Sequence, residues 1–451
     1  MKTLVTLGAG PKAVAVAAKA YALKSLGYEV PTITTVDPRG VGAHWVSDGG
    51  WTNGHHLLGT PPDKDVGFPY RTRLTQSPQE NLHIDAALTE LSWMRYLISQ
   101  DTYAEWIDRG HPCPTHEEWA QYLQWVAHTI DMAVVPGRIT AIRATHTNRG
   151  EGTSGEPTQW ECEIALNDGG TTMLNADGVM ITGPGPSTRR LSDAPGVLSI
   201  SELWKQMEDG TFPLRQRVAV IGSGESAASV VDQLAHMPCD EITIYSPAPT
   251  VYSRGESIFE NRLYTDPTQW RTLTLDERRD FIRRTDRGVF SQRVQNTVKN
   301  YGNINHQRGR VTDITPHDGA LILHIQDNDL PTAAATADIV VDARGADPLW
   351  FTELFPNQTS QCYAEHIVTT GTVEQIAENI GTHLHVAPPP CHQDGVSPAP
   401  VASGTHADSE PWLFLPTLSA LSQGPGFANL SCLGEVSDRI LGAYDIAHHT
   451  P

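Results

Sequence analysis

Residues 221–228 read IGSGESAA, and this short stretch decides the fold. An apolar run, RVAVI (217–221), precedes it, and a segment with helical spacing follows. Gly222, Gly224 and Ala227 occupy the small-residue positions of the pattern G-x-G-x-x-[GA]. In a dinucleotide fold the first glycine makes a tight turn, the second admits a pyrophosphate to the backbone, and the third small residue lets the helix pack on the strand. The stretch therefore predicts a nucleotide site in a parallel α/β unit.

The same pattern occurs a second time near the N-terminus. Residues 4–13 read LVTLGAGPKA and place Gly8, Gly10 and Ala13 at the same spacing. Asp37 ends the next predicted strand, TITTVD. A carboxylate at that point binds the ribose hydroxyls of FAD or NAD. Asp37 is followed by a proline, so a simple turn residue is the alternative interpretation.

The second fingerprint differs from the first at the ribose position. No carboxylate stands there, and the matching residue is Ser246. Ser246 and, further along, Arg254 are suited to bind a 2′-phosphate, which an acid would repel. This favours NADPH over NADH, although an ordinary surface arginine is the alternative for Arg254. Two fingerprints in one chain thus predict a resident flavin at the first site and the nicotinamide nucleotide that reduces it at the second.

Composition bounds the class of protein. The chain has 451 residues, a length typical of several domains. Its formal net charge of −20 argues against a nucleic-acid or anionic-membrane surface. We recognise no signal peptide and no apolar run long enough to cross a bilayer. The six cysteines contain no C-x-x-C pair, which favours reduced thiols, a cytoplasmic location and no disulfide-reductase chemistry. The Pro/Ser/His-rich stretch 387–411 lacks metal-ligand spacing and reads as a surface loop.

Six stretches in chain order resemble one family. It is the class B flavin monooxygenases that hydroxylate amino-acid side chains, and in particular the lysine N6-monooxygenases of mycobactin-type siderophore assembly. Each motif is weak alone, but six in the same order are specific. The stretches are GAGPKAVAVAAKA, WTNGHHLLGTPPDKDVGFPYR (51–71), RGESIFENRLYTDPTQW (254–270), LDERRDFIRRTDRGVFS (275–291), GADPLWF (345–351) and FLPTLSALSQGPGFANLSCLG (414–434).

The resemblance implies an N-hydroxylation that depends on FAD, NADPH and O2. NADPH reduces FAD, the reduced flavin reacts with O2, and the resulting C4a-hydroperoxyflavin converts L-lysine to N6-hydroxylysine for a hydroxamate siderophore. A lysine ammonium, with an ordinary pKa of about 10.4, has no lone pair and must first lose a proton. A dry pocket lowers that pKa by desolvation, so the protein needs positioning and water exclusion more than acid–base groups.

The resemblance also assigns residues. Lys64 matches the lysine that binds the substrate carboxylate, and Asn261 matches a substrate-binding asparagine near the nicotinamide. Asp286 stands where the ornithine enzymes have asparagine, and Ser431 falls at the flavin and substrate end of the last helix. No catalytic acid or base and no metal ligand is predicted. The residues that match the FAD site of the family are Gly8, Gly10, Ala13, Asp37 and Trp45.

Several of these residues have a plainer interpretation. Lys64 next to Asp65 reads equally as a solvated surface pair, and Asp286 in TDRG reads as a helix cap. Trp45 suits loop packing. The chain also departs from the family pattern: Gly59 replaces a glutamine of the ornithine enzymes, and Arg344 interrupts an A-T-G motif with no assignable role.

The expected fold is α/β, with two dinucleotide-binding (Rossmann-like) domains and a small substrate-binding region. An NADPH domain is inserted into a discontinuous FAD domain, whose second part carries a C-terminal substrate-site helix. The predicted limits are 1–195 and 336–451 for the FAD domain, 196–335 for the NADPH domain, and 51–71, 254–290 and 415–432 for substrate recognition.

Alternatives to lysine hydroxylation remain. The same chemistry on ornithine or a diamine depends on pocket depth, which the sequence does not show. Oxygenation of a ketone or sulfide, or a non-catalytic flavin- or nucleotide-binding protein, are further alternatives. The expected partners are a small amino acid and O2. Relatives suggest a homo-oligomer, and siderophore carrier proteins are partners if the lysine is carrier-bound rather than free.

Overall fold

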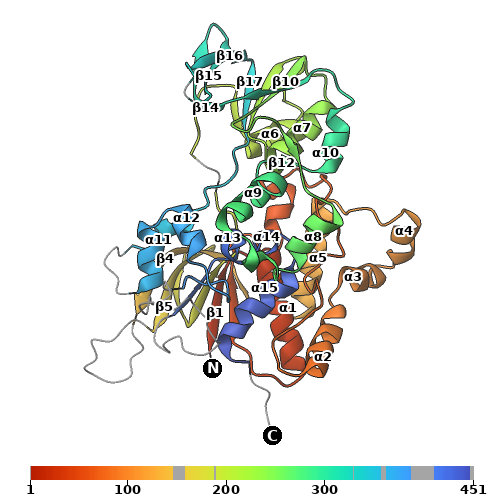
Figure 1. Cartoon of the computed structure of the whole chain (residues 1–451), viewed down its shortest axis with the longest axis vertical. Coiled ribbons are helices and arrows are strands. Elements are labelled where there is room, and N and C mark those ends of the chain that lie inside the picture. The colour runs from red at the N-terminus through yellow and green to blue at the C-terminus, as the bar shows by residue number, and fades with distance from the viewer. Residues whose placement is uncertain are drawn as a thin grey trace.

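The computed structural model describes residues 2–145, 158–186, 189–328, 330–356, 362–387 and 411–446. Two units, each built on one glycine fingerprint, make up this part of the chain, and Figure 1 shows the second unit above the first. The surface loop predicted at 387–411 lies, except for its two end residues, outside the described residues.

The first unit is built on a parallel sheet whose strands come from both ends of the chain. β1 pairs with β2 and β7, and β18, from near the C-terminus, completes the opposite edge. The first unit is therefore discontinuous in sequence. In sheet order the strands are β18 (Trp412–Phe414), β7 (Gly178–Ile181), β1 (Thr3–Leu7), β2 (Thr32–Val36) and β3 (Val134–Val135).

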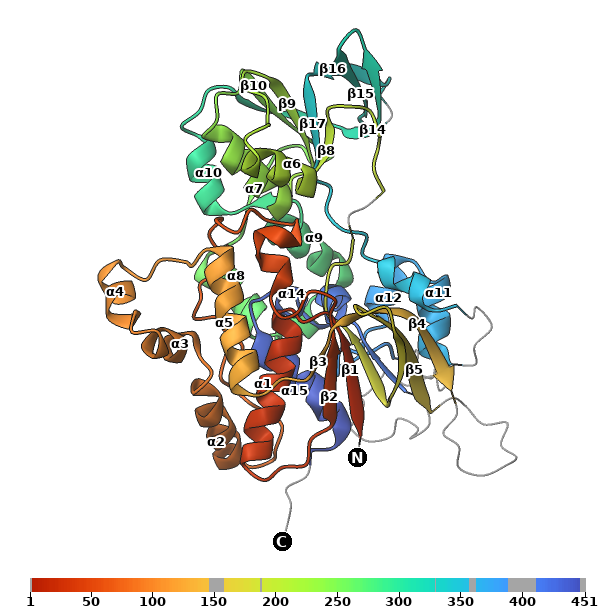
Figure 2. The same ribbon diagram turned by 180° about the vertical axis from the view of Figure 1, so that it is seen from behind.

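Helices cover one face of this sheet and a smaller antiparallel sheet covers the other (Figure 2). The central helix, α1 (Pro11–Ser25), is alanine-rich and almost wholly buried, because small side chains let it approach its neighbours closely. It packs against α2 (Pro78–Thr89), α5 (His116–Thr129) and α15 (Leu433–Leu441). The small sheet consists of β4 (Gly137–Thr145), β5 (Gln159–Leu166) and β6 (Thr171–Ala176).

The second unit repeats this plan. Its five strands are all parallel, with helices on one face and an antiparallel three-stranded sheet on the other. The strands, in sheet order, are β13 (Ile304–Arg308), β10 (Glu241–Ser246), β9 (Arg217–Ile221), β17 (Ile339–Asp342) and β8 (Val197–Ser199). The helices are α6 (Ile200–Glu208), α7 (Glu225–Ala235) and α10 (Gln292–Val298), and the covering strands are β14 (Arg310–His317), β15 (Ala320–Gln326) and β16 (Ala333–Ala337).

One strand lies beyond the predicted limit of the inserted domain. The sequence-based prediction ends that domain at residue 335, but β17 pairs with β9 and β8 inside the second sheet. Parallel pairing joins strands that are far apart in sequence, so a local pattern cannot reveal it. We propose that the inserted NADPH domain extends to Asp342 and that the other predicted limits stand.

The remaining elements connect the two units or surround the site. α8 and α9 lie at the level between the units in Figure 1. Within the described residues, no helix combines the length and the apolar character needed to cross a membrane. The bounds are α3 (Trp93–Ser99), α4 (Tyr103–Asp108), β11 (Tyr252–Ser253), α8 (Ile258–Thr265), α9 (Leu275–Thr285), β12 (Val289–Phe290), α11 (Tyr363–Thr370), α12 (Val373–Glu378), α13 (Ala420–Gln423), α14 (Pro425–Ala428), and the 3-10 turns η1 (Ala43–Trp45), η2 (Ser47–Gly49), η3 (Trp270–Thr272), η4 (Trp350–Leu354), η5 (Pro416–Leu418) and η6 (Gly442–Tyr444).

Candidate active site

Both fingerprints form the turn that their first glycine predicts. Gly8 has a φ of +93°, and a Cβ there would lie 2.7 Å from Thr182 Oγ1. Gly222 has a φ of +123°, and a Cβ there would lie 2.5 Å from the carbonyl oxygen of Ala343. Left-handed backbone and lack of space both require glycine at these positions. Ala13 and Ala227 are fully buried where each helix crosses its strand.

The start of each fingerprint helix has the donors and the space that a nucleotide pyrophosphate needs. Gly10 caps α1 and Gly224 caps α7, and within the described residues no side chain caps either helix. A Cβ on Gly10 or Gly224 would meet nothing within 4 Å. Free backbone N–H groups at an open helix N-terminus bind phosphate. The residues present therefore fit two dinucleotides, as FAD and NADPH require.

Asp37 follows β2 at the edge that faces the first fingerprint. Ala9 N donates to Asp37 Oδ2 at 3.0 Å, and the backbone N–H groups of Arg39 and Gly40 donate to Oδ1 at 2.8 and 3.0 Å. These bonds fix the carboxylate beside Gly8 and Gly10. Asp37 also starts a turn, so the turn interpretation and the ribose prediction are compatible.

Ser246 and Arg254 do not share a contact. Ser246 ends β10, is 1% exposed and lies 3.0 Å from His306 Nε2. Arg254 instead donates to the carbonyl oxygen of Gly59 at 3.5 Å. The joint 2′-phosphate site that the sequence predicted is thus not assembled, because β11–β12 pairing carries Arg254 toward the first unit. Arg308 lies in register beside Ser246 on β13.

A cavity of about 290 Å³ lies where the two units meet. Residues of η1 and the following loop form one side, and residues of α7 form another. Trp45, predicted at the FAD site, lines this cavity, and so do Arg254 and Asp286. The lining residues are His44, Trp45, Trp51, Thr52, Leu58, Gly59, Thr60, His116, Glu225, Ser226, Ser229, Arg254, Asp286, Val289, Asn429 and Leu430.

Two histidines of the cavity wall are neutral. Burial lowers the pKa of His44 to about 4 and that of His116 to about 3. Thr52 Oγ1 lies 2.8 Å from His116 Nδ1. The part of the wall formed by Trp45, Trp51 and these imidazoles therefore carries no charge, whereas Glu225, Arg254 and Asp286 place charged groups elsewhere in the lining. No spacing in the sequence identifies these histidines, because their burial depends on the meeting of distant segments.

Lys64 and Asn261 meet, as two residues of one substrate site must. Lys64 Nζ donates to Asn261 Oδ1 at 3.1 Å, and Asn261 Nδ2 donates to the carbonyl oxygen of Glu256 at 2.9 Å. Burial, and then the charge of Arg254, lower the pKa of Lys64. An ammonium beside an amide is a donor set that fits a carboxylate.

The alternative interpretation of Lys64 and Asp65 as a solvated surface pair is wrong. Asp65 is 2% exposed, and burial raises its pKa to about 6. Its carboxylate accepts from Tyr70 Oη at 2.8 Å and from the backbone N–H of Trp93 at 2.9 Å. Asp65 thus anchors the loop from the inside, and Lys64 points the other way, toward Asn261.

Asp286 and Ser431 are joined by a residue that was not singled out. Asn429 Nδ2 donates to Asp286 Oδ1 at 3.1 Å, and Ser431 N donates to Asn429 Oδ1 at 2.8 Å. Asp286 also occupies the C-cap of α9, so the cap interpretation is correct, while its carboxylate still lines the cavity. Ser431 is buried just before α15.

The two departures from the family pattern have a structural explanation. A Cβ on Gly59 would lie 3.0 Å from Glu225 Oε1, so a larger side chain at residue 59 requires the end of the Glu225 side chain to move. Arg344 pairs with Asp342 at 2.8 Å and donates to the carbonyl oxygen of Arg189 at 2.5 Å. It therefore ties β17 to the connection between the units.

Two dinucleotide-binding units around one cavity define the class of flavin-dependent oxidoreductases that draw electrons from a nicotinamide nucleotide. The L-lysine 6-monooxygenase/L-ornithine 5-monooxygenase family matches residues 87–315. The chain belongs to this family. It is 44% identical over 445 residues to the L-lysine N6-monooxygenase MbtG of Mycobacterium tuberculosis (strain H37Rv), a match that covers 98% of this chain and 94% of that protein.

Solved structures agree with the predicted fold. Lysine monooxygenase NbtG from Nocardia farcinica, which has an unprecedented conformation of its NADPH domain, superposes with a TM-score of 0.81 at 42% identity, over 98% of this chain and 100% of that one. The ornithine N-hydroxylase KtzI from Kutzneria sp. 744, solved with reduced FAD, NADP+ and L-ornithine, superposes with a TM-score of 0.71 at 16% identity over 98% of each chain. The α/β fold with two Rossmann-like domains is confirmed.

Proposed function

We propose that this protein is an FAD- and NADPH-dependent monooxygenase that converts L-lysine to N6-hydroxylysine for hydroxamate siderophore biosynthesis. The observation that carries the proposal is the contact between Lys64 and Asn261, which are 197 positions apart in sequence and meet near Arg254, a residue of the cavity wall. The 44% identity to lysine N6-monooxygenases over 98% of the chain supports lysine rather than ornithine.

The cofactors are held by the fingerprints. Gly8, Gly10, Ala13 and Asp37 would hold FAD, and Trp45 would lie beside it in the cavity wall. Gly222, Gly224 and Ala227 would hold NADPH, with Ser246 at its ribose; Arg308, in register beside Ser246, is a better placed 2′-phosphate ligand than Arg254. When bound, NADPH supplies the reducing electrons and FAD activates O2 for transfer of one oxygen atom to the amine.

The substrate is oriented by charge at its amino-acid end. Lys64 and the amide of Asn261 bind the α-carboxylate, and the carboxylate of Asp286 accepts a hydrogen bond from the α-ammonium group. Asn429 keeps Asp286 in place, and Ser431 fixes Asn429 in turn. These contacts place the side-chain amine in the cavity by orientation alone.

The uncharged part of the cavity wall would favour the neutral amine that the reaction needs, whereas Glu225 and Asp286 would favour the ammonium beside them. His44 and His116 are uncharged, and Trp45 and Trp51 exclude water. An ammonium that leaves water for such surroundings has a lowered pKa and releases its proton more readily. This is why the site works without a dedicated general base.

Assembly and location are the finer parts of the proposal. We expect a homo-oligomer, to be tested by light scattering of the purified protein. A cytoplasmic location is supported by the free thiols of Cys113, Cys162, Cys239 and Cys432 among the described residues. A carrier-protein partner is expected only if the substrate is a tethered lysine.

The deciding experiment measures product. The purified protein, loaded with FAD, is given NADPH and O2 together with L-lysine, L-ornithine or cadaverine, and the hydroxylamine formed is quantified by mass spectrometry. Product from L-lysine alone is expected. Product from ornithine or cadaverine would keep the chemistry and overturn the substrate. NADPH oxidation that yields only hydrogen peroxide would overturn free lysine, and an acylated or carrier-bound lysine would then be the substrate to test.

A further inference from the structure

Lys12 is a buried cation that the function above does not use. It belongs to the first turn of α1, inside the first fingerprint, and is 6% exposed. Its Nζ donates one hydrogen bond, to the carbonyl oxygen of Ala428 at 3.0 Å. Within the described residues no carboxylate lies within ion-pair distance of it. An ammonium carries three donors, and a buried charge is normally paired, so Lys12 is left with unused bonding capacity.

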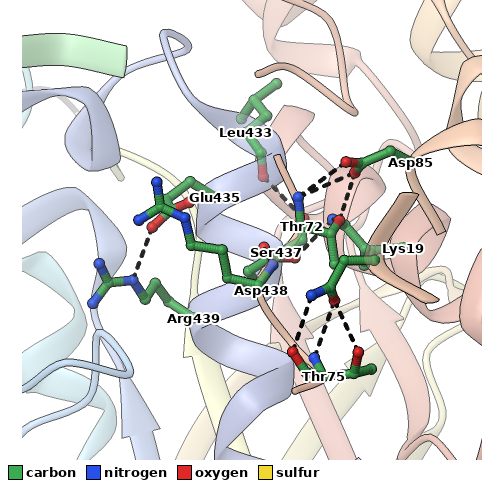
Figure 3. A network of polar contacts seen from close by, with 11 residues as sticks. Lys19, Thr72, Thr75, Asp85, Leu433, Glu435, Ser437, Asp438 and Arg439 are labelled. Atoms are coloured by element: carbon green, nitrogen blue, oxygen red, sulfur yellow. Dashed lines mark hydrogen bonds and ion pairs between the residues drawn. The ribbon is translucent and has the colours of Figure 1, made fainter. Parts of the chain in front are cut away.

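A second lysine on the same helix shows what a purely structural buried lysine looks like. Lys19, two turns further along α1, is 1% exposed and donates to Thr72 Oγ1 at 2.5 Å and to Asp438 Oδ1 at 2.7 Å. Thr72 donates in turn to Asp85 at 2.6 Å (Figure 3). This network ties α1 to α2 and α15, and the charge of Lys19 is paired. The fold therefore neutralises one buried lysine of α1 and leaves the other without a carboxylate.

The surroundings of Lys12 point toward the cavity. Ala428 ends α14, and the next two residues, Asn429 and Leu430, line the cavity wall. The ionisable groups that face Lys12 are Cys432 and Asp286. Burial raises the pKa of the Cys432 thiol well above its usual range, so this group is neutral, whereas the charge of Asp286 acts on Lys12 from beyond ion-pair distance and offsets only part of the effect of burial. Neither group forms an ion pair with the ammonium in the described part of the chain.

The proposed function supplies more than one anion near this cation: the pyrophosphate of FAD is charged in both redox states, whereas the flavin becomes charged only on reduction. The pyrophosphate of FAD would bind at the N-terminus of α1, in the turn that carries Lys12, so the bound cofactor would lie close to this side chain. Oxidised flavin is neutral, whereas two-electron reduction leaves a negative charge spread over N1 and the C2 carbonyl. A cation fixed in a low-dielectric wall stabilises that charge strongly. The substrate carboxylate is the weaker candidate, because Lys64 and Asn261 already provide its donors.

We propose that Lys12 is the cation that stabilises anionic, reduced FAD in this protein. The inference rests on the proposed function, because it requires FAD at the first fingerprint. It assigns to Lys12 a role that the glycine pattern does not contain, since the residue at this position of the fingerprint is otherwise unspecified. Lys12 binds the reduced flavin more tightly than the oxidised flavin and thereby raises the reduction potential of the bound cofactor.

The test measures the reduction potential of bound FAD by anaerobic dye equilibration, without substrate or turnover. Lys12→Met keeps the length and apolar stem of the side chain and removes its charge. We expect about a tenfold loss of affinity for reduced relative to oxidised FAD, which lowers the two-electron potential by about 30 mV. The melting temperature at neutral pH should not fall. The matched control, Lys19→Met, should lower the melting temperature and leave the potential unchanged.

The outcomes separate this inference from the proposed function. An unchanged potential in Lys12→Met with FAD bound overturns the inference alone. An equal fall in both variants assigns the effect to general loosening of α1 and also overturns it. A raised KM for lysine with an unchanged potential would make Lys12 a substrate residue instead. Failure of the wild-type protein to bind FAD would overturn the proposed function together with the inference.

Discussion

The two fingerprint helices begin in the same way and carry opposite charges at their entrances. α1 has Lys12 in its first turn, and α7 has Glu225. A cation near a phosphate site favours retention of an anionic nucleotide, while a carboxylate opposes it. The difference suits a flavin that stays bound through every turnover and a nicotinamide nucleotide that must leave. The same glycine turn and helix N-terminus thus suit a cofactor that stays bound and one that exchanges, and the neighbouring side chains set the affinity for each nucleotide.

The largest effect should come from substituting the first glycine of one fingerprint at a time. Gly222→Ala places a Cβ 2.5 Å from the backbone oxygen of Ala343 at a φ of +123°, so the turn must deform. We expect at least a 100-fold loss in kcat/KM for NADPH with FAD content unchanged. Gly8→Ala should instead lose FAD, measured from flavin absorbance per protein. Gly302→Ala is the control, because a Cβ there meets nothing within 4 Å. Loss of both nucleotides from either variant would mean that the sites are not separable.

The next effect concerns how much the buried Lys12 ammonium on α1 lowers the free energy of unfolding. Burial lowers the pKa of Lys12 from its ordinary value of 10.5 to about 8. The unfolded chain therefore binds more protons than the folded one between about pH 8 and 10.5, and the stability of the apoprotein should rise with pH through this window. Lys12→Met removes both the cost and the pH dependence.

We expect the Lys12→Met apoprotein to be more stable than wild type by up to about 3 kcal/mol at pH 7, with the advantage declining toward pH 10.5. Urea unfolding of both proteins across this pH range measures it, and the difference between the two curves removes titrations that they share. An apoprotein destabilised by Lys12→Met at pH 7 would show that Lys12 is a structural residue like Lys19.

Removal of the Lys64 ammonium, which is proposed to bind the substrate, should leave both nucleotide sites intact. Lys64→Met deletes the ammonium proposed to bind the α-carboxylate and keeps the apolar stem. We expect KM for L-lysine to rise about 30- to 100-fold, which is about 2 to 2.7 kcal/mol and is typical of a lost charge-assisted contact. NADPH oxidation should continue and form hydrogen peroxide. Lys205→Met, in which an exposed lysine is removed from the second unit, is the control. Unchanged KM would place the carboxylate elsewhere.

The accuracy of the sequence-based predictions depends on how far apart in sequence the interacting residues are. The glycine spacing and the flanking strand and helix are local, so the sequence predicted both nucleotide units. The place of β17 depends on parallel pairing with distant strands, and it was predicted in the wrong unit. His44, His116 and Lys12 gain their properties from burial by segments far away in sequence. Arg254 was grouped with Ser246 because they are close in sequence, yet it contacts Gly59.

The smallest effect should come from the carboxylate at the NADPH helix. Glu225 is exposed to solvent at the cavity, yet partial desolvation by the cavity wall raises its pKa, while the charge of Arg254 opposes the rise. Glu225→Gln keeps the shape beside Gly59 and removes the charge. We expect the Kd for NADP+, measured by calorimetry, to fall about fivefold, and less at high salt, because exposed charges are screened. Glu241→Gln, at the start of β10 and at the opposite end of that strand from Ser246, is the control and should bind NADP+ as the wild type does. Weaker binding in Glu225→Gln would show that the carboxylate holds Arg254 for the nucleotide rather than repelling it, and the contrast between the two helices would then lie in Lys12 alone.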